Sequence, residues 1–185
     1  MPGADDNAQV EVATLAGGCF WCIEAVYKEV EGVIDAIPGY SGGTTVDPSY
    51  GQVSTGKTGH AESVQVTFDS SRISYREILE IFFSVHDPTT LDRQGADIGT
   101  QYRSAIFYHD EQQKKVAEEI IQEMTRDRVF SHSIVTQIVP LDRFYPAEDY
   151  HRDYFEKHPE QAYCQVVIAP KLAKFRQHWE AKLRK

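Results

Sequence analysis

Residues 10–23 read V-E-V-A-T-L-A-G-G-C-F-W-C-I, and this stretch sets the local architecture. Its β-branched beginning favours a strand over residues 10–16, and the two glycines that follow interrupt the strand. We expect a helix to run from Cys19 to a stop at Gly32, because the apolar residues between them recur at helical spacing. The first thiol of a C-x-x-C pair therefore stands where a strand turns into a helix.

The position of Cys19 predicts chemistry as well as structure. A side chain at a helix start lies near unpaired backbone N–H groups and the positive end of the helix dipole. Such a location lowers the pKa of a thiol, and the thiolate is the reactive nucleophile. Two other interpretations stay open. Cysteine is a common small core residue, and C-x-x-C alone is typical of thioredoxin-like dithiol oxidoreductases.

The rest of the chain alternates between strand and helix patterns. Strands are predicted at residues 33–37, 63–68, 103–108 and 134–139. Helices are predicted to begin at the Ser74 capping box, at Asp110 and at Pro170, with a short one over residues 147–157. The order strand, helix, strand, strand, helix, strand is the split βαβ pattern. We therefore predict an α+β fold, a two-layer sandwich with a ferredoxin-like core plus an extra C-terminal strand and helices.

The composition indicates a single acidic globular domain of 185 residues with a net charge of -9. Nucleic-acid binding requires a basic face and anionic membranes attract basic segments, so we expect neither partner. No apolar run approaches the ~18 residues that a membrane helix needs. Residues 1–9 are polar and lack a signal-peptide pattern, so we expect a disordered tail there. Residues 10–185 should form one catalytic domain of a cytoplasmic monomer.

Residues 51–58, G-Q-V-S-T-G-K-T, match the phosphate-loop pattern G-x-x-x-x-G-K-T. That motif works only between a strand and a helix whose N-terminus holds the phosphate. Here a turn-like D-P-S-Y precedes the motif, and a strand pattern begins a few residues after it. The match lies in a Gly-, Ser- and Thr-rich stretch, residues 38–59, whose composition explains it. We therefore reject nucleotide binding.

The three cysteines are odd in number and too few for a disulfide framework. A zinc site would need two further ligands at suitable spacing, and Cys164, His151 and His158 do not provide it. We expect neither a metal ion nor a bound cofactor. Two thiols close in sequence favour redox chemistry instead.

An aromatic pair beside Cys19 and a glutamate at a predicted strand start are further candidates for the site. Phe20 and Trp21 follow Cys19 directly and can line a pocket beside its sulfur, which would suit an apolar group such as a methyl. Glu62 ends the segment G-H-A-E at the start of a predicted strand. In solvent it would be an ordinary carboxylate, but beside an apolar pocket its pKa would rise and it could act as an acid. Spacing alone does not choose between these interpretations.

Several motifs together resemble one known family. They are G-C-F-W-C at 18–22, G-Y-S-G-G at 39–43, D-P-S-Y at 47–50, T-G-H-A-E at 58–62, A-D-I-G-T-Q-Y-R-S at 96–104 and P-A-E-D-Y-H at 146–151. With these motifs the chain strongly resembles the peptide-methionine (S)-S-oxide reductases, the MsrA family. The likeness spans nearly all of the chain, from Val10 to the C-terminal helix. The family's ferredoxin-like α/β sandwich agrees with the element order above.

The resemblance implies an oxidoreductase that repairs oxidative damage. It would reduce the S epimer of methionine sulfoxide, free or in proteins, to methionine in a thiol-dependent reaction. It implies that Cys19 attacks the substrate sulfur and that Glu62 gives a proton to the sulfoxide oxygen. The other implied roles are substrate contacts: Phe20 and Trp21 around the methyl group, and Tyr50, Asp97 and Tyr102 around the oxygen.

The resemblance also implies how the enzyme is recycled. The attack leaves Cys19 as a sulfenic acid, and a second thiol converts it to an intramolecular disulfide. In the family, thioredoxin is the usual reductant of that disulfide, and dithiothreitol serves in vitro. The second thiol is either Cys164 or Cys22. Cys22 is one helical turn from Cys19. Cys164 occupies the family's Tyr-Cys position, although the Q-V-V-I after it looks like a strand that would limit its reach. We favour Cys164.

Overall fold

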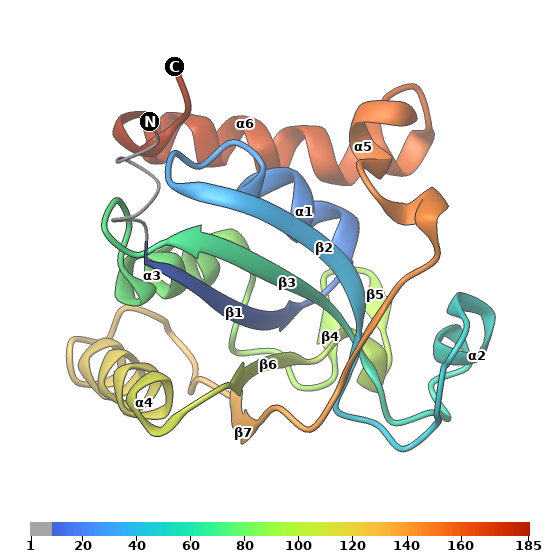
Figure 1. Ribbon diagram of the computed structural model, residues 1–185, viewed down its shortest axis with the longest axis horizontal. Helices are drawn as coiled ribbons and strands as arrows, with labels where there is room; N and C mark the ends of the chain where they lie inside the picture. Colours follow the sequence, from blue (N-terminus) through green and yellow to red (C-terminus); the bar gives the residue numbers. More distant parts are fainter. Residues whose placement is uncertain (1–8) are drawn as a thin grey trace.

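The structure, a computed structural model, describes residues 9–185 (Figure 1). Within this range, six strands form one curled sheet in the order β7-β6-β1-β3-β2-β8. They are β1 (Val10–Gly17), β2 (Val33–Ser41), β3 (Ala61–Asp69), β6 (Ser104–Tyr108), β7 (Gln137–Pro140) and β8 (Phe144–Pro146). A separate short hairpin consists of β4 (Arg93–Gln94) and β5 (Asp97–Ile98). The helices are α1 (Phe20–Tyr27), α2 (Tyr50–Ser54), α3 (Tyr75–Val85), α4 (Glu111–Arg126), α5 (Tyr154–Lys157) and α6 (Ala169–His178).

The sheet topology brings the ends of four strands together along one edge, which runs across the strands. β1 lies between β3 and β6 and is antiparallel to both. β2 pairs antiparallel with the other side of β3, so β1 and β2 run parallel and α1 connects them. β1 and β2 therefore end where β3 and β6 begin. At this edge Gly17 is opposite Ser104, and Tyr40 is opposite Glu62.

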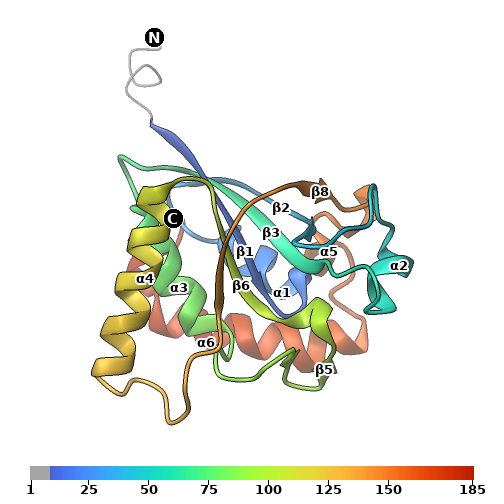
Figure 2. The ribbon, with the colours of Figure 1, turned by 90° about the horizontal axis from the view of Figure 1, so that it is seen from below.

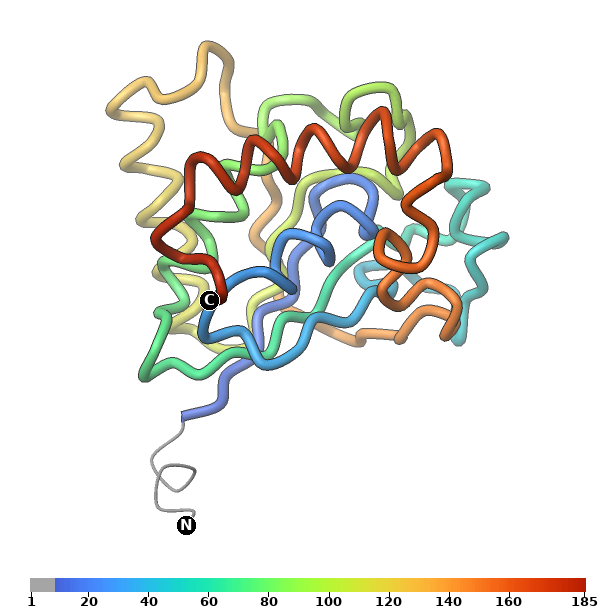
Figure 3. The backbone as a smooth tube through the Cα atoms, turned by 90° about the horizontal axis from the view of Figure 1, so that it is seen from above, coloured from blue at the N-terminus to red at the C-terminus, as the bar shows by residue number. Residues whose placement is uncertain are grey.

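The core lies between the sheet and its helices. α1 and α3 contact the sheet and each other, and α3 also contacts α4 and α6 (Figure 2). α6 lies beside α1 in both Figure 1 and Figure 3. Large aromatic side chains such as Tyr27, Phe68 and Phe82 are fully buried. Tyr27 also donates its hydroxyl to the backbone oxygen of Ile78 at 2.6 Å, which satisfies a polar group that burial would otherwise leave unpaired.

The predicted order of strands and helices is confirmed through β6, and the structure adds elements that were not predicted. The stretch predicted as loop, residues 38–59, contains the last part of β2 and the short helix α2. The phosphate-loop match, residues 51–58, lies within α2 and the turn after it, so no helix follows the motif to hold a phosphate. β8 is a short strand at the edge of the sheet, where its proline is tolerated.

The strand expected after Cys164 is wrong. Residues Cys164–Ile168 form a π-helical turn that leads directly into α6. Cys164 and Ile168 are buried while Val166 between them is 74% exposed, which is the periodicity of a helix and not of a strand. Packing of one helical face therefore overrides the local β-propensity of the two valines.

Two sequence predictions concern the N-terminal tail and membrane-spanning helices. The predicted tail, residues 1–9, falls on residues that, apart from Gln9, lie outside the described range. Among residues 9–185, no helix is long and apolar enough to span a bilayer.

Candidate active site

Cys19 is the N-cap residue of α1, just beyond the end of β1. Two glycines allow the chain to reach this position. Gly18 has a φ of 92°, a left-handed conformation that favours glycine, and a Cβ there would lie 2.6 Å from Gln94. A Cβ on Gly17 would lie 2.9 Å from the ring of Phe82. The Gly-Gly pair therefore lets the turn pack closely against β4 and α3.

Glu62 lies at the start of β3, at the same edge of the sheet, and is only 2% exposed. Its Oε1 accepts a hydrogen bond at 3.1 Å from the backbone N–H of Phe20, one of the donors that a helix start leaves free. Burial raises the pKa of Glu62 to about 8, and the negative charge of Asp97 adds to the rise. The Phe20 N–H opposes it. Glu62 is therefore mostly a neutral carboxylic acid at pH 7.

The two thiols of the C-x-x-C pair are shifted in opposite directions. Burial raises the pKa of the Cys19 thiol well above its ordinary value, and Cys22 and Glu62 add to the rise. The hydrogen bond from Cys19 lowers the pKa of the Cys22 thiol, and the positive charge of Lys171 assists. The prediction that the helix start lowers the pKa of Cys19 is therefore wrong. Desolvation outweighs the helix end, whose nearest N–H already binds Glu62.

Aromatic rings form a wall beside Cys19. The ring centroid of Phe20 lies 5.1 Å from that of His151 and 6.2 Å from that of Tyr50. Trp21 stacks on Tyr154 with centroids 3.7 Å apart and planes 5° from parallel. The indole Nε1 of Trp21 donates to Nδ1 of His151 at 3.0 Å, which fixes the ring orientation. Phe20 is buried and Trp21 is half-buried, so the wall is open on the side of Trp21.

The structure also brings Tyr50, Asp97 and Tyr102 to this edge. The ring of Tyr50 lies against that of Phe20, and the turn that carries Tyr102 contacts β3. Burial raises the pKa of Tyr50 and of Tyr102, and the charges of Glu62 and Cys19 add to both shifts. Both phenols therefore stay protonated at neutral pH and can donate hydrogen bonds. The side chain of Gln101 ties the two segments together, because its Nε2 donates to the backbone oxygen of Ser54 at 3.1 Å.

The three thiols belong to one buried apolar cluster. Cys19, Cys22 and Cys164 pack together with Ile168, and Trp21 and Tyr163 lie against them. All three are free cysteines. Burial raises the pKa of the Cys164 thiol, and the negative charge of the Cys22 thiolate adds a smaller rise. Both candidate resolving thiols are therefore neighbours of the same site.

The sequence analysis assigned no role to several residues that hold the site together. The hydroxyl of Tyr163 donates to Oδ2 of Asp97 at 2.7 Å, and its side chain packs against the cluster that contains Cys19. Glu148 accepts from the hydroxyl of Tyr40 and from the backbone N–H of Tyr50, each at 2.8 Å. Glu148 and His151 belong to the motif P-A-E-D-Y-H, and Tyr163 precedes Cys164, so their positions in the motifs were the available signal.

Comparisons with known proteins show the family of the chain. The model of the family described as peptide methionine sulfoxide reductase matches residues 11–183. The chain belongs to the peptide methionine sulfoxide reductase family.

Individual members of the family are similar to this chain in sequence and in structure. The chain is 61% identical over 166 residues to the peptide methionine sulfoxide reductase MsrA of Saccharolobus solfataricus, covering 90% of this chain and 93% of that one. Among solved structures, reduced Mxr1 from Saccharomyces cerevisiae aligns with a TM-score of 0.79 at 36% identity, over 84% of this chain and 90% of the other. Mxr1 in complex with Trx2 aligns with a TM-score of 0.57 at 28% identity, over 79% and 85% of the chains.

The donor groups of the site fit organic redox chemistry. Among residues 9–185, no three His, Cys, Asp or Glu side chains gather as they would around a metal ion. What the site contains is a buried thiol, a neutral carboxylic acid, two phenols and an aromatic wall. A family member with these groups can deliver a proton and a sulfur nucleophile to the same substrate.

Proposed function

We propose that this enzyme reduces the S epimer of methionine sulfoxide, free or in proteins, to methionine, with Cys19 as the nucleophile and Glu62 as the proton donor. The observation that carries the proposal is the pairing of a buried, neutral Glu62 with a thiol on the neighbouring helix start. A sulfoxide oxygen is a poor leaving group until it is protonated, so a carboxylic acid that keeps its proton at neutral pH is the group required.

The proposed chemical step conserves atoms and charge. The sulfur of Cys19 attacks the sulfoxide sulfur while the oxygen takes the proton of Glu62. The attack forms a bond between the two sulfurs, and the protonated oxygen then leaves the substrate sulfur as hydroxide. This hydroxide bonds to the sulfur of Cys19 while the bond between the two sulfurs breaks with its electron pair on methionine, so methionine leaves and Cys19 becomes a sulfenic acid. Cys19 has given up its own proton, which restores the neutral acid. Because burial raises the pKa of Cys19, its thiol holds a proton at neutral pH, and the attack requires that this proton leave.

The surroundings of the two groups support recognition of one epimer. We place the substrate methyl against Phe20 and Trp21, whose rings offer an apolar surface. We place the oxygen within reach of the hydroxyls of Tyr50 and Tyr102, with Asp97 beside them. Methyl and oxygen then have separate sites on a tetrahedral sulfur, so the opposite epimer would direct one of them to the wrong partner.

Recycling requires a second thiol, and we propose Cys164 for this role. Its thiol condenses with the sulfenic acid, forming a disulfide and releasing water. Cys164 lies in the same buried cluster as Cys19 and is on a helical turn rather than in a sheet, so no strand pairing has to break when it moves. Cys22 is the alternative, because it lies three residues from Cys19 and packs in the same buried cluster. The complex of Mxr1 with Trx2 supports thioredoxin as the reductant.

Further proposals concern the whole chain. We propose that residues 10–185 are one catalytic domain whose strands β6-β1-β3-β2 form a ferredoxin-like core, and that it acts as a monomer without a bound cofactor. Three free thiols suit a reducing compartment, which supports the cytoplasm.

Separated sulfoxide epimers with dithiothreitol test the proposed function. Turnover of the S epimer alone is expected, and Cys19→Ser is the negative control. The runner-up is a thioredoxin-like dithiol oxidoreductase, which the lowered pKa of Cys22 would suit. Reduction of insulin disulfides without turnover of either sulfoxide epimer would favour that function and reject ours.

A further inference from the structure

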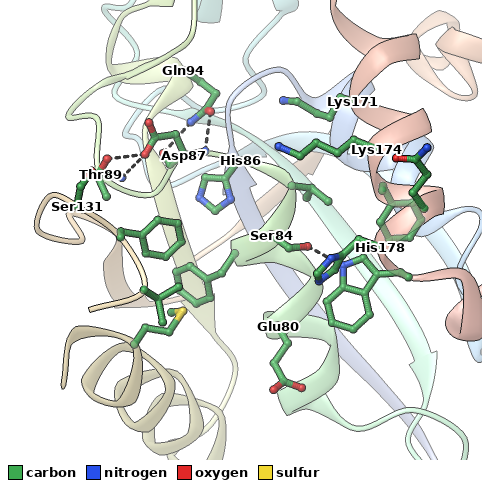
Figure 4. A pocket seen from close by; sticks show the side chains of 18 of the residues that line it. Glu80, Ser84, His86, Asp87, Thr89, Gln94, Ser131, Lys171, Lys174 and His178 are labelled. Carbon is green, nitrogen blue, oxygen red and sulfur yellow. Dashed lines mark hydrogen bonds between the residues drawn. The ribbon is translucent and has the colours of Figure 1, made fainter. Parts of the chain in front are cut away.

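A cleft of about 1140 Å³ lies between α6, the end of α3 and the segment that follows α4 (Figure 4). We call it the α6 cleft. None of the residues proposed for catalysis lines it. It does not belong to the site described above, and neither the reduction nor the recycling uses it.

The floor of the α6 cleft is apolar. Phe83 of α3, Met124 of α4 and Phe175 of α6 contribute to it, and Trp179 closes one end by donating its indole N–H to the hydroxyl of Ser84 at 2.8 Å. On the rim, the side chain of Val129 is 58% exposed. An apolar floor of this kind can bury a hydrophobic side chain of a ligand.

One wall of the cleft is cationic. Lys171, Lys174 and His178 project from one side of α6, and Figure 4 shows the ammonium groups of both lysines reaching into the cleft. Across residues 9–185, neither lysine forms an ion pair. The carboxylates of the cleft do have partners. Asp87 accepts from the backbone N–H of Thr89 at 2.9 Å, and Glu80 pairs with Arg76 at 3.8 Å. The partners of Asp87 are neutral, so within this range its charge has no ion pair either. Two ammonium groups against this one carboxylate leave a net positive charge in the cleft, in a chain whose net charge is -9.

We propose that the α6 cleft binds an acidic polypeptide segment that carries an apolar side chain between its carboxylates. The two lysines are three residues apart on α6, about 4.5 Å along the helix axis, so neighbouring carboxylates of an extended chain can each meet one. The apolar side chain enters over Phe83 and Phe175. A groove formed by three separate elements and open along α6 suits an extended chain.

Occupation of the cleft is coupled to the thiols by its inner wall. Gln94 and His86 line the cleft and pack against the turn before Cys19, where a Cβ on Gly18 or Gly17 would lie 2.6 Å or 3.0 Å from them. The positive charge of Lys171 also lowers the pKa of Cys22. A carboxylate bound to Lys171 would oppose that effect, so ligand binding should make Cys22 a weaker acid.

Calorimetric titration with short peptides tests the proposal without relying on turnover. The probe is acetyl-Glu-Phe-Glu-Leu-amide, which contains no methionine and so cannot enter the sulfoxide reaction. Acetyl-Gln-Phe-Gln-Leu-amide is the uncharged control. We expect the acidic peptide to bind more tightly, and its affinity to fall as salt rises. Lys171→Gln with Lys174→Gln should weaken its binding roughly 2- to 30-fold, the range for two exposed ion pairs.

Two more variants make the result specific. Lys115→Gln with Lys185→Gln removes the same charge from exposed positions outside the cleft and should leave the affinity unchanged. Val129→Ser should weaken both peptides, because it removes exposed apolar surface without touching the core. Equal binding of the two peptides, an equal loss in both lysine pairs, or binding of 8-anilinonaphthalene-1-sulfonate without binding of the acidic peptide would overturn the proposal.

Discussion

The site around Cys19 and the α6 cleft meet at the Gly17–Gly18 turn, yet Glu62 and Cys19 at the site are neutral and the two lysines of the cleft are charged. At the site the titratable groups are buried, so Glu62 holds its proton at pH 7 and Cys19 keeps its own. In the cleft, the side chains of half-buried Lys171 and exposed Lys174 reach over an apolar floor. A large cleft therefore indicates a binding site, whereas shifted pKa values indicate a catalytic site.

Removal of the nucleophile should have the largest effect. Cys19→Ser should lower sulfoxide reduction by roughly 10⁴-fold or more, even with excess dithiothreitol, because no other residue can accept the oxygen. Single-turnover assays of methionine release would measure it. Retention of more than about a percent of wild-type activity, far above the scale of nucleophile loss, would remove Cys19 from the mechanism.

Loss of the proton donor should have the next largest effect. Glu62→Gln keeps an oxygen for the N–H of Phe20 but cannot give up a proton, so the chemical step should slow by roughly 10²-fold or more. Glu62→Asp should lose less, since an acid remains. If the single-turnover rate of Glu62→Gln equals that of wild type at neutral pH, Glu62 has only a structural role.

The recycling thiols distinguish two halves of the reaction. Cys164→Ser should keep dithiothreitol-driven activity and lose most thioredoxin-driven turnover, whereas the matched variant Cys22→Ser should retain both. Peptide mapping after one equivalent of methionine sulfoxide should find Cys19 bonded to Cys164. A bond between Cys19 and Cys22, with full thioredoxin-driven turnover in Cys164→Ser, would instead assign recycling to Cys22.

The smallest expected effect sharpens the contrast between site and cleft. Lys174→Gln should change the rate of free methionine sulfoxide reduction by less than about twofold, because exposed charges interact only weakly. Steady-state assays with and without added salt would check it. A loss comparable to that of Glu62→Gln would show that the cleft takes part in the chemistry itself.

The sequence was sufficient for the parts of the fold that rest on local signals. The strand over residues 10–16, the start of the helix at Cys19 and the Ser74 capping box all follow from periodicity and caps, and the structure has them. The predicted stop of that helix at Gly32 is wrong, because α1 ends at Tyr27. The turn at Cys164–Ile168 was mispredicted as a strand, because Val166 and Val167 carry β-propensity while tertiary packing selects a helix.

The site could be predicted as a set of residues but not as an electrostatic environment. The C-x-x-C motif indicated the proposed nucleophile and predicted the wrong direction for its pKa, because burial depends on distant segments that no local pattern contains. Glu62 could not be distinguished from a solvated residue until β3 placed it behind Phe20. Tyr163 and Glu148 reach the site across 66 and 98 residues of chain, to Asp97 and Tyr50, and sequence spacing does not report such contacts.

The proposed protonation of the sulfoxide oxygen requires a neutral Glu62, because a carboxylate would repel this oxygen rather than protonate it. Burial displaces the pKa upward, so the proton stays on below about pH 8 and leaves as the pH rises through that value. The difference infrared spectrum between wild type and Glu62→Gln, recorded across this range, observes the group directly. We predict a protonated carboxyl band at pH 7 that disappears with a midpoint near 8. Carboxylate bands at pH 7, with a midpoint near the ordinary value for glutamate, about 4.3, would contradict the account.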